Sequence, residues 1–365
     1  MKVYTVTYLS ENYGSVLQAY ALQQAIKSCG AEPVILKKNP VKRTIQYRAQ
    51  GFIKPRENYT LFMRLKIRLQ GKKYKLKKEK VHRFIDQYIT TEMVNSTSEI
   101  ISTLQTDDLL LAGSDQIWTM LDAPISEWYT FHWDNLPADI KKYSYAASIG
   151  VSVLSEDEKK QYQDALSDFN IISFRERQTY ELLKDRFKQP VRCDIDPTLL
   201  FNGDYWKCFA QNHIEKEPYI FVYMLRPDKE LIRQSIKLAK KLHCRVIYTG
   251  KMADKFFGVK TVYDAGIEDY LSYIAHAEAV VTNSFHGTVF SILFQKQFAS
   301  VRIATTSSRA ENLLNLTGLE DRFANDDEIV SVMEKPINYR EVFVKLDAAR
   351  QDSLRYIRRI CQQRG

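Results

Sequence analysis

Short apolar runs and amphipathic stretches alternate along most of this chain. Residues 3–9 are mainly β-branched and aromatic, and beyond Gly14 apolar residues recur at the three- and four-residue spacing of a helix, from Val16 to Ala25. The same order returns later, where residues 219–225 form a continuous apolar run and residues 227–242 have helical spacing. Strands without polar alternation, separated by helices, are typical of parallel sheets that are buried on both faces.

The whole pattern contains two such series of strands and helices. Further strands are predicted at residues 33–37, 108–112, 143–148, 170–174, 245–249, 279–282 and 298–303, and further helices at residues 78–88, 177–187, 268–276 and 287–294. We therefore predict an α/β fold with two doubly wound Rossmann-like domains that face a cleft. The expected domains are residues 1–205, with a basic helical insertion at about 60–90, and residues 206–340. A C-terminal helix, residues 341–365, is expected to pack back on the first domain.

The composition agrees with two folded domains. A chain of 365 residues is too long for one ordinary core, and its 45% hydrophobic and 27% charged residues are typical of globular proteins. The five cysteines are scattered, which favours reduced thiols. The first residues run directly into a strand pattern, and no apolar stretch approaches the roughly 20 residues that cross a bilayer, so we expect a cytoplasmic location.

Much of the net charge of +9 is concentrated between Arg64 and Arg83, where Glu79 is the only acidic residue. A solvated helix face, an anionic membrane surface and a phosphorylated substrate each account for such a stretch. Nucleic acid is not expected as a partner, because no recognised binding motif accompanies the charge. No metal is expected either, because the six histidines are dispersed and no carboxylates have ligand spacing.

Ligands of open parallel sheets bind beyond the carboxyl ends of the strands. This rule selects four loops of the predicted fold, at residues 10–14, 113–118, 174–177 and 283–287. Their side chains are the candidates for binding and chemistry.

The loop at residues 283–287 turns a buried strand into a new helix. Asn283 or Ser284 can cap that helix, and its first free amides form an anion site. His286 can give or take a proton near neutral pH, and Gly287 allows a ligand or backbone to approach closely. A capped helix with an incidental histidine explains the turn equally well.

Arginines follow two of the predicted strands. Arg175 ends the strand at residues 170–174, and Arg302 and Arg309 flank a Ser/Thr-rich loop that includes Ser308. An arginine fork can grip a phosphate or a carboxylate through two bonds. Ion pairs explain Arg302 and Arg309 equally well, with Glu311, Glu320 or Asp321 as their partners.

The other two loops carry groups suited to sugar hydroxyls. One offers the backbone and side chains of Asn12, Tyr13 and Gly14, and it lacks the glycine spacing of a dinucleotide site. The other offers an amide, a carboxylate and an aromatic surface, from Ser114, Asp115, Gln116 and Trp118. Helix capping by Ser114 or Asp115 explains the second loop nearly as well.

Taken in order, these loops resemble the polysaccharide pyruvyl transferase family. The matching stretches run from Asn12 to Arg322 and are NYGSVLQAYAL, AGSDQIW, YAASIG, SFRE, DPTLL, VTNSFHGTVFS and SRAENLLNLTGLEDR. The chain departs from the commonest family pattern at Thr119, Ile149 and Asn283, where Asn, Phe and Asp are usual. The first departure bears on the acceptor pocket, the second on packing, and the third exchanges one helix cap for another.

The resemblance implies a fold like that of the two-domain GT-B glycosyltransferases, with phosphoenolpyruvate as donor and no further cofactor. It also implies a cell-surface saccharide as acceptor, often carried on a polyprenyl diphosphate lipid. Such an acceptor would give the basic stretch between Arg64 and Arg83 a purpose, because it could hold the enzyme at the anionic inner leaflet.

Combined with the resemblance, the residues suggest a division of roles. His286 is expected as the general acid, and Asp115 as the group that activates or orients an acceptor hydroxyl. The expected donor site comprises Arg175, Ser284, Gly287, Arg302, Ser308 and Arg309. The expected acceptor site comprises Asn12, Tyr13, Gly14, Ser114, Gln116 and Trp118. Arginines can neutralise the donor phosphate, so this scheme requires no metal.

Two other functions fit the same pattern. A nucleotide-sugar glycosyltransferase on the same architecture would use a similar histidine and similar arginines to hold a diphosphate. A non-catalytic protein that binds saccharide or lipid within a polymer-assembly complex would need only the binding loops.

Overall fold

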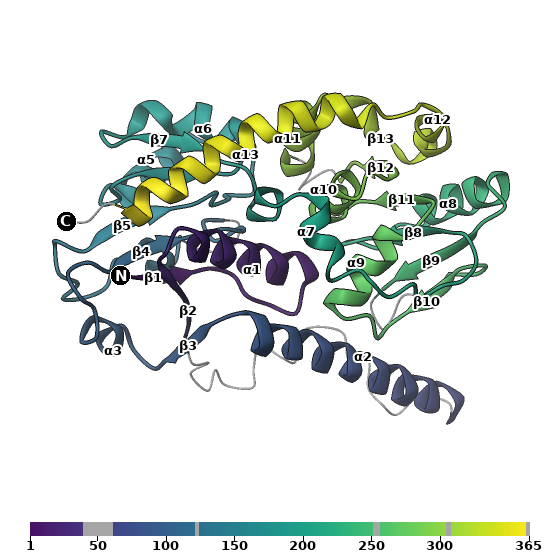
Figure 1. Cartoon of the computed structure of the whole chain (residues 1–365), viewed down its shortest axis with the longest axis horizontal. Helices are drawn as coiled ribbons and strands as arrows, with labels where there is room; N and C mark the ends of the chain where they lie inside the picture. The colour runs from purple at the N-terminus through teal and green to yellow at the C-terminus, as the bar shows by residue number, and fades with distance from the viewer. Residues whose placement is uncertain (39–60, 121–123, 251–255, 304–307, 363–365) are drawn as a thin grey trace.

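Two parallel β-sheets lie side by side, and helices cover both faces of each (Figure 1). The structure is a computed structural model and describes residues 1–38, 61–120, 124–250, 256–303 and 308–362. In spatial order the first sheet consists of β3 (Thr91–Val94), β2 (Glu32–Lys38), β1 (Lys2–Val6), β4 (Leu109–Ala112) and β5 (Lys141–Ser144). The second consists of β10 (Lys260–Val262), β9 (Arg245–Thr249), β8 (Tyr219–Tyr223), β11 (Ala279–Thr282), β12 (Gln297–Val301) and β13 (Phe323–Ala324).

Side chains of the first sheet alternate between two buried faces. Tyr4 and Val6 of β1 pack on one face, with side chains from α3 (Thr97–Ile101), α4 (Glu127–Thr130), α5 (Glu156–Leu166) and α6 (Arg177–Leu183). Val3 packs on the opposite face, with α1 (Tyr13–Ser28) and α13 (Tyr339–Gln362). Because both faces are apolar, each strand is a continuous hydrophobic run in the sequence.

A small parallel pair, β6 (Ile172–Phe174) and β7 (Val191–Cys193), extends the first sheet beyond β5. Isolated bridges join Tyr143 to Ile171 and Ala147 to Phe174. A 3₁₀ helix at Pro197–Leu200 follows β7 and leads to α7 (Gly203–Lys207).

The second sheet is buried in the same way. Phe221 and Val280 pack against α9 (Ile267–Ala275) and α10 (Phe285–Leu293), whereas Val222 and Val281 pack against α8 (Lys229–Lys241) and α12 (Ile329–Glu334). Two further helices are α2 (Leu61–Tyr88), which precedes β3 along the chain, and α11 (Ser308–Thr317), which connects β12 to β13.

The two halves share one hydrophobic cluster, so they form a continuous core. Tyr13 of α1 stacks on Tyr270 of α9 with ring centroids 4.5 Å apart, and its hydroxyl donates to the carbonyl of Ala265 over 2.8 Å. Tyr20 of α1 contacts Trp206 of α7 at a centroid distance of 5.9 Å. This packing fixes the loops of one half relative to those of the other.

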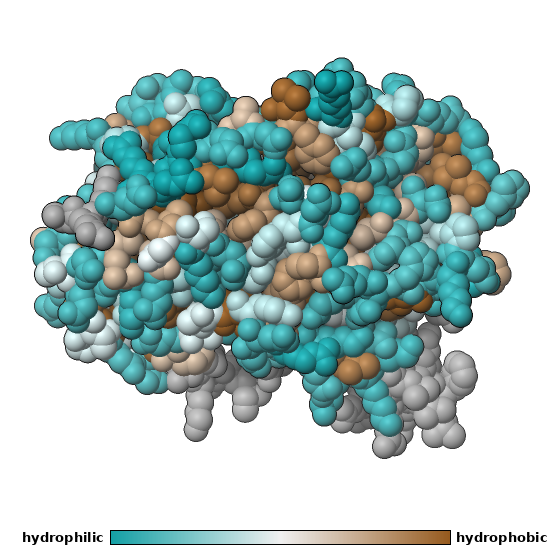
Figure 2. Space-filling model, viewed as in Figure 1, coloured by the Kyte–Doolittle hydropathy of each residue, from teal (hydrophilic) through white to brown (hydrophobic). Residues whose placement is uncertain are grey.

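Helix α13 crosses from the second half back over the first (Figure 1). The Tyr356 hydroxyl donates to the carbonyl of Ser144 over 2.8 Å, and Nε of Arg350 donates to the carbonyl of Leu199 over 2.7 Å. Figure 2 shows that hydrophilic residues cover most of this face, with hydrophobic residues visible beside α13, between the halves and near α8 and α12.

The predicted fold class is confirmed, and the differences concern particular elements. Strand β5 ends at Ser144, whereas the sequence predicts a strand at residues 143–148; the chain leaves the ladder because Ala146 has a φ of 43°. The strands β3, β7, β10 and β13 are absent from the sequence prediction. They are edge strands of two to four residues, and such short segments have too few buried positions to form an apolar run.

Candidate active site

The order of the strands reverses at one point in each sheet, between β1 and β4 and between β8 and β11. In doubly wound sheets such a point leaves a crevice at the carboxyl ends of the strands. The loops after all four strands meet at one cavity of about 400 Å³, which we call the first cavity. Its wall includes Tyr8, Ser10, Asn12, Asp115, Gln116, Leu225, Ser284, Phe285, His286 and Arg309.

The start of α10 forms the wall contributed by the second half. Ser284 is the N-cap, and its Oγ accepts from the amide of Gly287 over 3.4 Å. Asn283 accepts from the amide of Leu225 over 2.8 Å and thereby joins the loop after β8 to the loop after β11. A Cβ on Gly287 would lie 2.2 Å from Oγ1 of Thr282, so only glycine lets α10 start this close to β11. The first amides of a helix lack intrahelical partners and favour an anion.

His286 lies directly against the first turn of α1. A Cβ on Gly14 would be 2.0 Å from Nδ1 and 2.4 Å from Cγ of the imidazole ring. The ring therefore occupies the space that any larger residue at position 14 would need. Gly14 does not line the cavity. The sequence predicts that Gly14 lets a ligand approach closely, but in the structure it is the His286 ring that lies against it.

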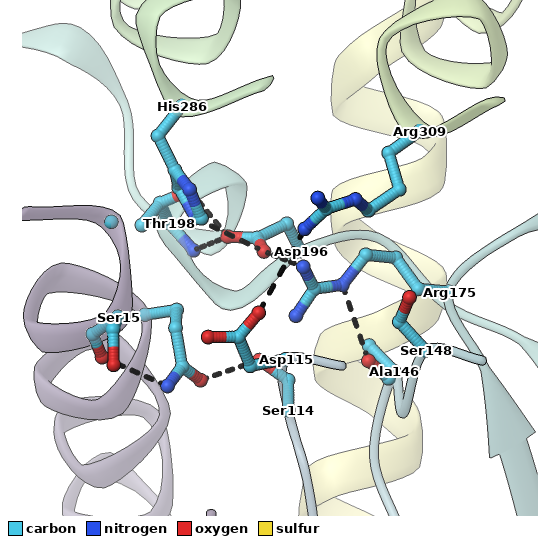
Figure 3. Close-up of polar contacts among 12 residues, drawn as sticks. Ser15, Ser114, Asp115, Ala146, Ser148, Arg175, Asp196, Thr198, His286 and Arg309 are labelled. Atoms are coloured by element: carbon cyan, nitrogen blue, oxygen red, sulfur yellow. Dashed lines mark hydrogen bonds and ion pairs between the residues drawn. The ribbon is translucent and has the colours of Figure 1, made fainter. Parts of the chain in front are cut away.

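The carboxylate of Asp196 lies behind the imidazole and joins the functional groups (Figure 3). Its Oδ2 is 3.5 Å from Nε2 of His286 and 3.0 Å from Nη1 of Arg175, while its Oδ1 accepts from the amide of Thr198 over 2.9 Å. Burial alone would raise the pKa of Asp196, but Arg175 and His286 outweigh that effect and hold it well below its usual range. Asp196 is thus an ionised carboxylate in the protein interior.

Arg175 and Arg309 both lie close to the Phe285 ring. Each guanidinium carbon is 5.6 Å from the ring centroid, and Nη1 of Arg309 is 3.8 Å from Oδ1 of Asp115. Burial lowers the pKa of Arg309, and the nearby carboxylate of Asp115 partly offsets this lowering. Nε of Arg175 donates to the carbonyl of Ala146 over 3.2 Å, which fixes the direction of that side chain.

Glu176 is buried next to this group. Burial raises its pKa, against the opposing effect of Arg175, and its Oε1 accepts from the hydroxyl of Ser148. Two guanidinium groups, one imidazole and three carboxyl groups therefore meet where the halves join. Such a cluster can hold an anion and move a proton.

The structure brings together several residues that the sequence selects. Asn12, Asp115, Gln116, Ser284, His286 and Arg309 line the first cavity. Arg175 and Arg309 line a neighbouring cavity of about 740 Å³, which we call the second cavity. Among the described residues, it shares Phe285 and Arg309 with the first.

Three of the predicted acceptor residues are turned into the protein. Ser114 is fully buried and donates to Oε1 of Gln18 over 2.6 Å. Trp118 is also fully buried, and its Nε1 donates to the carbonyl of Tyr129 over 3.1 Å. Tyr13 packs in the shared core. Each side chain braces a loop because its polar atom finds a partner inside, so none lines either cavity.

Two of the predicted donor residues also lie outside both cavities. Arg302 lies 4.1 Å above the Phe323 ring, half exposed, with Nη1 3.9 Å from Oε1 of Glu311. The carbonyl of Ser308 accepts from Nδ2 of Asn312 within α11. Gly287 acts through its packing on Thr282 and not through the cavity wall.

Asp196 and Phe285 were not selected from the sequence, although both lie within the matching stretches. Asp196 follows β7, an edge strand that the sequence does not predict, so the rule of strand ends could not select it. The Asp-Pro-Thr sequence at the start of a 3₁₀ helix, directly after β7, was the available signal.

Part of the basic stretch contacts the protein itself. Lys77 lies 4.3 Å above the Tyr13 ring, Lys78 pairs with Glu11 over 2.9 Å, and Lys80 pairs with Asp269 over 2.6 Å. In the described part of the stretch, the exposed basic side chains are Lys72, Lys73, Lys75 and Arg83. The side chains of Arg64, Lys66 and Arg68 lie outside the described residues.

The described residues contain no group of three or more His, Cys, Asp or Glu side chains arranged to hold a metal ion. Within the same residues, no helix has the length and apolar character needed to cross a membrane.

Solved structures resemble the chain over nearly its whole length at low sequence identity. UGT89C1 of Arabidopsis thaliana, complexed with UDP-L-rhamnose, has a TM-score of 0.53 and 10% identity, with 99% of both chains covered. S. aureus MnaA, in a co-structure with UDP, has a TM-score of 0.51 and 11% identity, covering 95% of this chain and 91% of that one. Identity this low shows the fold alone. The architecture is the two-domain GT-B type found in glycosyltransferases and epimerases.

The family follows from the sequence. The family model for polysaccharide pyruvyl transferase matches residues 12–304, which is most of the chain. This protein therefore belongs to the polysaccharide pyruvyl transferase family. A comparison with curated proteins returned no match.

Proposed function

We propose that this protein transfers the pyruvyl group of phosphoenolpyruvate to two hydroxyls of a saccharide and releases phosphate. Family membership supports the reaction class. The observation that supports phosphoenolpyruvate as the donor is the arrangement of His286, Arg175 and Arg309 around one buried junction, beside the N-terminus of α10. Phosphoenolpyruvate has a phosphate and a carboxylate, and this junction offers separate contacts for each.

In this proposal the donor binds in the first cavity. One anionic group takes the amides of the first turn of α10, and the other takes Arg309, whose contact with Asp115 is long at 3.8 Å. Arg175 stabilises the site from behind Phe285. The positive charges would stabilise the charge that develops on the departing phosphate, without a metal or further cofactor in the scheme.

The chemistry begins with protonation of the methylene carbon, which becomes a methyl group while the enol carbon becomes cationic. One sugar hydroxyl attacks the enol carbon and loses its proton, and the phosphate then leaves with its bridging oxygen. A second hydroxyl attacks the same carbon, loses its proton and closes the ketal. The methyl group has gained one proton and the hydroxyls have lost two, so hydrogen phosphate carries the other away.

His286 is the general acid in this scheme, and Asp196 is its positioning residue. The carboxylate faces Nε2 and stabilises the positive charge of a protonated imidazole. Asp115, on the opposite wall of the first cavity, orients the acceptor hydroxyl that reaches the donor there. The test measures phosphate release from phosphoenolpyruvate in the presence of an acceptor oligosaccharide pool. It compares His286→Ala with the control His213→Ala, because His213 is exposed and far along the sequence from these loops. Release should fall about 100-fold or more only in the first variant; full release by His286→Ala would exclude the role.

A nucleotide-sugar donor is the competing interpretation of the same fold. Melting temperatures in the presence of phosphoenolpyruvate and of a panel of nucleotide sugars separate the two donors, because only a ligand that binds the folded state raises the melting temperature. A rise with phosphoenolpyruvate alone supports the proposal. A rise with a nucleotide sugar alone contradicts it.

The acceptor in this proposal is a surface saccharide on polyprenyl diphosphate, and the exposed side chains of α2 hold the enzyme at anionic lipids. The exposed Lys72, Lys73, Lys75 and Arg83 support the second point. Sedimentation with vesicles that contain anionic phospholipid measures it. A doubly substituted Lys72→Glu, Lys73→Glu protein should bind less, and equal binding would contradict the membrane contact.

A further inference from the structure

The second cavity lies between α6, α11 and α13, where the two halves meet. Its volume of about 740 Å³ exceeds the 400 Å³ of the first cavity, and Phe285 and Arg309 line both spaces. We propose that the second cavity holds the body of the acceptor saccharide, with its reacting hydroxyls directed past Phe285 and Arg309 to the donor in the first cavity. This inference rests on the proposed function and assigns its acceptor site.

Position is the first argument. Arg175 and Asp196 line the second cavity, and Oδ2 of Asp196 is the atom that lies 3.5 Å from Nε2 of His286. His286 itself lines the first cavity. A ligand in either space therefore reaches the same group of charged residues, as a reaction between two bound molecules requires.

The side chains of the wall provide the second argument. Leu182, Leu199, Leu313 and Leu316 supply an apolar surface, which suits the C–H faces of a sugar ring. The side-chain amides of Gln178 and Asn315 supply donors and acceptors for hydroxyls.

Some of this hydrogen-bonding capacity is unused within the protein. Oε1 of Gln178 is buried and has no hydrogen-bond partner among the described residues, and the same holds for Nη2 of Arg175. Buried polar atoms normally have partners, so both atoms have capacity for a polar ligand. The charged Arg175 is almost wholly enclosed, with its side chain 3% exposed.

The loops predicted to bind the acceptor provide the third argument. The polar atoms of Ser114, Trp118 and Tyr13 form hydrogen bonds inside the protein. Asn12, Asp115 and Gln116 line the same cavity as Ser284 and His286. The loops expected to bind donor and acceptor therefore line the first cavity together. The second cavity provides the larger space that a saccharide needs.

Two substitutions separate the cavities experimentally. Leu316→Trp, at a side chain 38% exposed on the rim, reduces the space of the second cavity only. Gln116→Ala alters the first cavity only and is the matched control.

Binding of phosphoenolpyruvate is measured by calorimetry, and binding of a panel of methyl glycosides of hexoses and N-acetylhexosamines by saturation-transfer-difference NMR. Circular dichroism and melting temperature verify that each variant is folded, and Gln178→Ala, which removes a hydrogen-bonding group without adding volume, replaces Leu316→Trp should the latter not fold.

We expect Leu316→Trp to weaken glycoside binding by about tenfold or more and to leave phosphoenolpyruvate binding unchanged. We expect Gln116→Ala to weaken phosphoenolpyruvate binding and to leave glycoside binding unchanged. Equal glycoside binding by the wild type and Leu316→Trp would overturn it, as would a wild type that binds phosphoenolpyruvate and no glycoside. A wild type that binds glycosides in the second cavity but no phosphoenolpyruvate would overturn the proposed function and leave this inference standing.

Discussion

Oδ2 of Asp196 lies 3.5 Å from Nε2 of His286 inside the protein, where Asp196 lines the second cavity and His286 lines the first. The same oxygen is 3.0 Å from Nη1 of Arg175. Burial would raise the pKa of this carboxyl, but the two cationic neighbours lower it, so the site maintains one negative charge behind the imidazole. The pair has the form of a general acid with its positioning carboxylate.

Asp196→Asn should reduce kcat about 100-fold, because the imidazole loses the charge that orients it, while the KM for phosphoenolpyruvate changes much less. The lowered pKa of Asp196 means that its contribution to stability is present above its unfolded value of about 3.9 and is lost as pH falls through the folded value. Urea unfolding of the wild type should therefore show an acid-side loss of stability that Asp196→Asn lacks. Unchanged kcat would show that the carboxylate only holds Arg175.

Gly14→Ala should inactivate the enzyme without unfolding it. The new methyl group would lie 2.0 Å from Nδ1 of His286, so the imidazole must move, and a displacement of about 1 Å can cost roughly 100-fold in rate. Phosphate release and the melting temperature report activity and folding. The matched control is Gly71→Ala in α2, where a Cβ meets nothing within 4 Å and full activity is expected. Full activity of Gly14→Ala would mean that His286 does not act from this position.

Glu176→Gln should make stability less dependent on pH. Burial raises the pKa of Glu176, so between its unfolded value of about 4.3 and its folded value the native state binds more protons than the unfolded state. This group therefore makes the wild type less stable as pH rises through that window. The variant lacks this effect, and its free energy of unfolding should rise relative to wild type as pH increases above the unfolded value of about 4.3. Parallel curves for the two proteins would contradict a buried, proton-binding Glu176.

Arg309→Lys and Arg302→Lys should behave differently, although the sequence presents both as donor contacts. Arg309 is enclosed at the junction of the cavities, and losing its fork geometry should raise the KM for phosphoenolpyruvate roughly ten- to hundredfold. Arg302 rests on Phe323, half exposed, and its replacement should leave KM within about twofold, the range expected of a surface substitution. Steady-state kinetics with varied phosphoenolpyruvate provides both values. An equal rise in KM for the two variants would mean that the donor extends to Arg302.

Much of the fold could be read from the sequence because the central strands are buried on both faces. β9 and β11 have the predicted bounds, and β1, β2 and β8 differ from prediction only at their ends. Edge strands such as β7 and β13 could not be found, because their few residues are paired on one side only. The longer central strands were therefore predicted, whereas edge strands of two to four residues were missed.

The candidate site shows the same limit. His286 and Arg309 could be selected because they follow strands that the sequence predicts, whereas Asp196 follows an unpredicted edge strand. Local sequence also could not show that Ser114 and Trp118 turn inward, because their partners Gln18 and Tyr129 lie elsewhere in the chain. Direction and partnership are set by tertiary packing, which residue type alone does not reveal.

The central claim is transfer of a pyruvyl group from phosphoenolpyruvate to a saccharide. The most direct measurement is mass spectrometry of a lipid-linked oligosaccharide pool after incubation with the purified protein and phosphoenolpyruvate isotope-labelled at the enol carbon. The account predicts that the label appears in a saccharide as a pyruvate ketal, with one phosphate released per ketal, and that His286→Ala forms none. An unlabelled pool beside a sugar transferred from an added nucleotide sugar would contradict it.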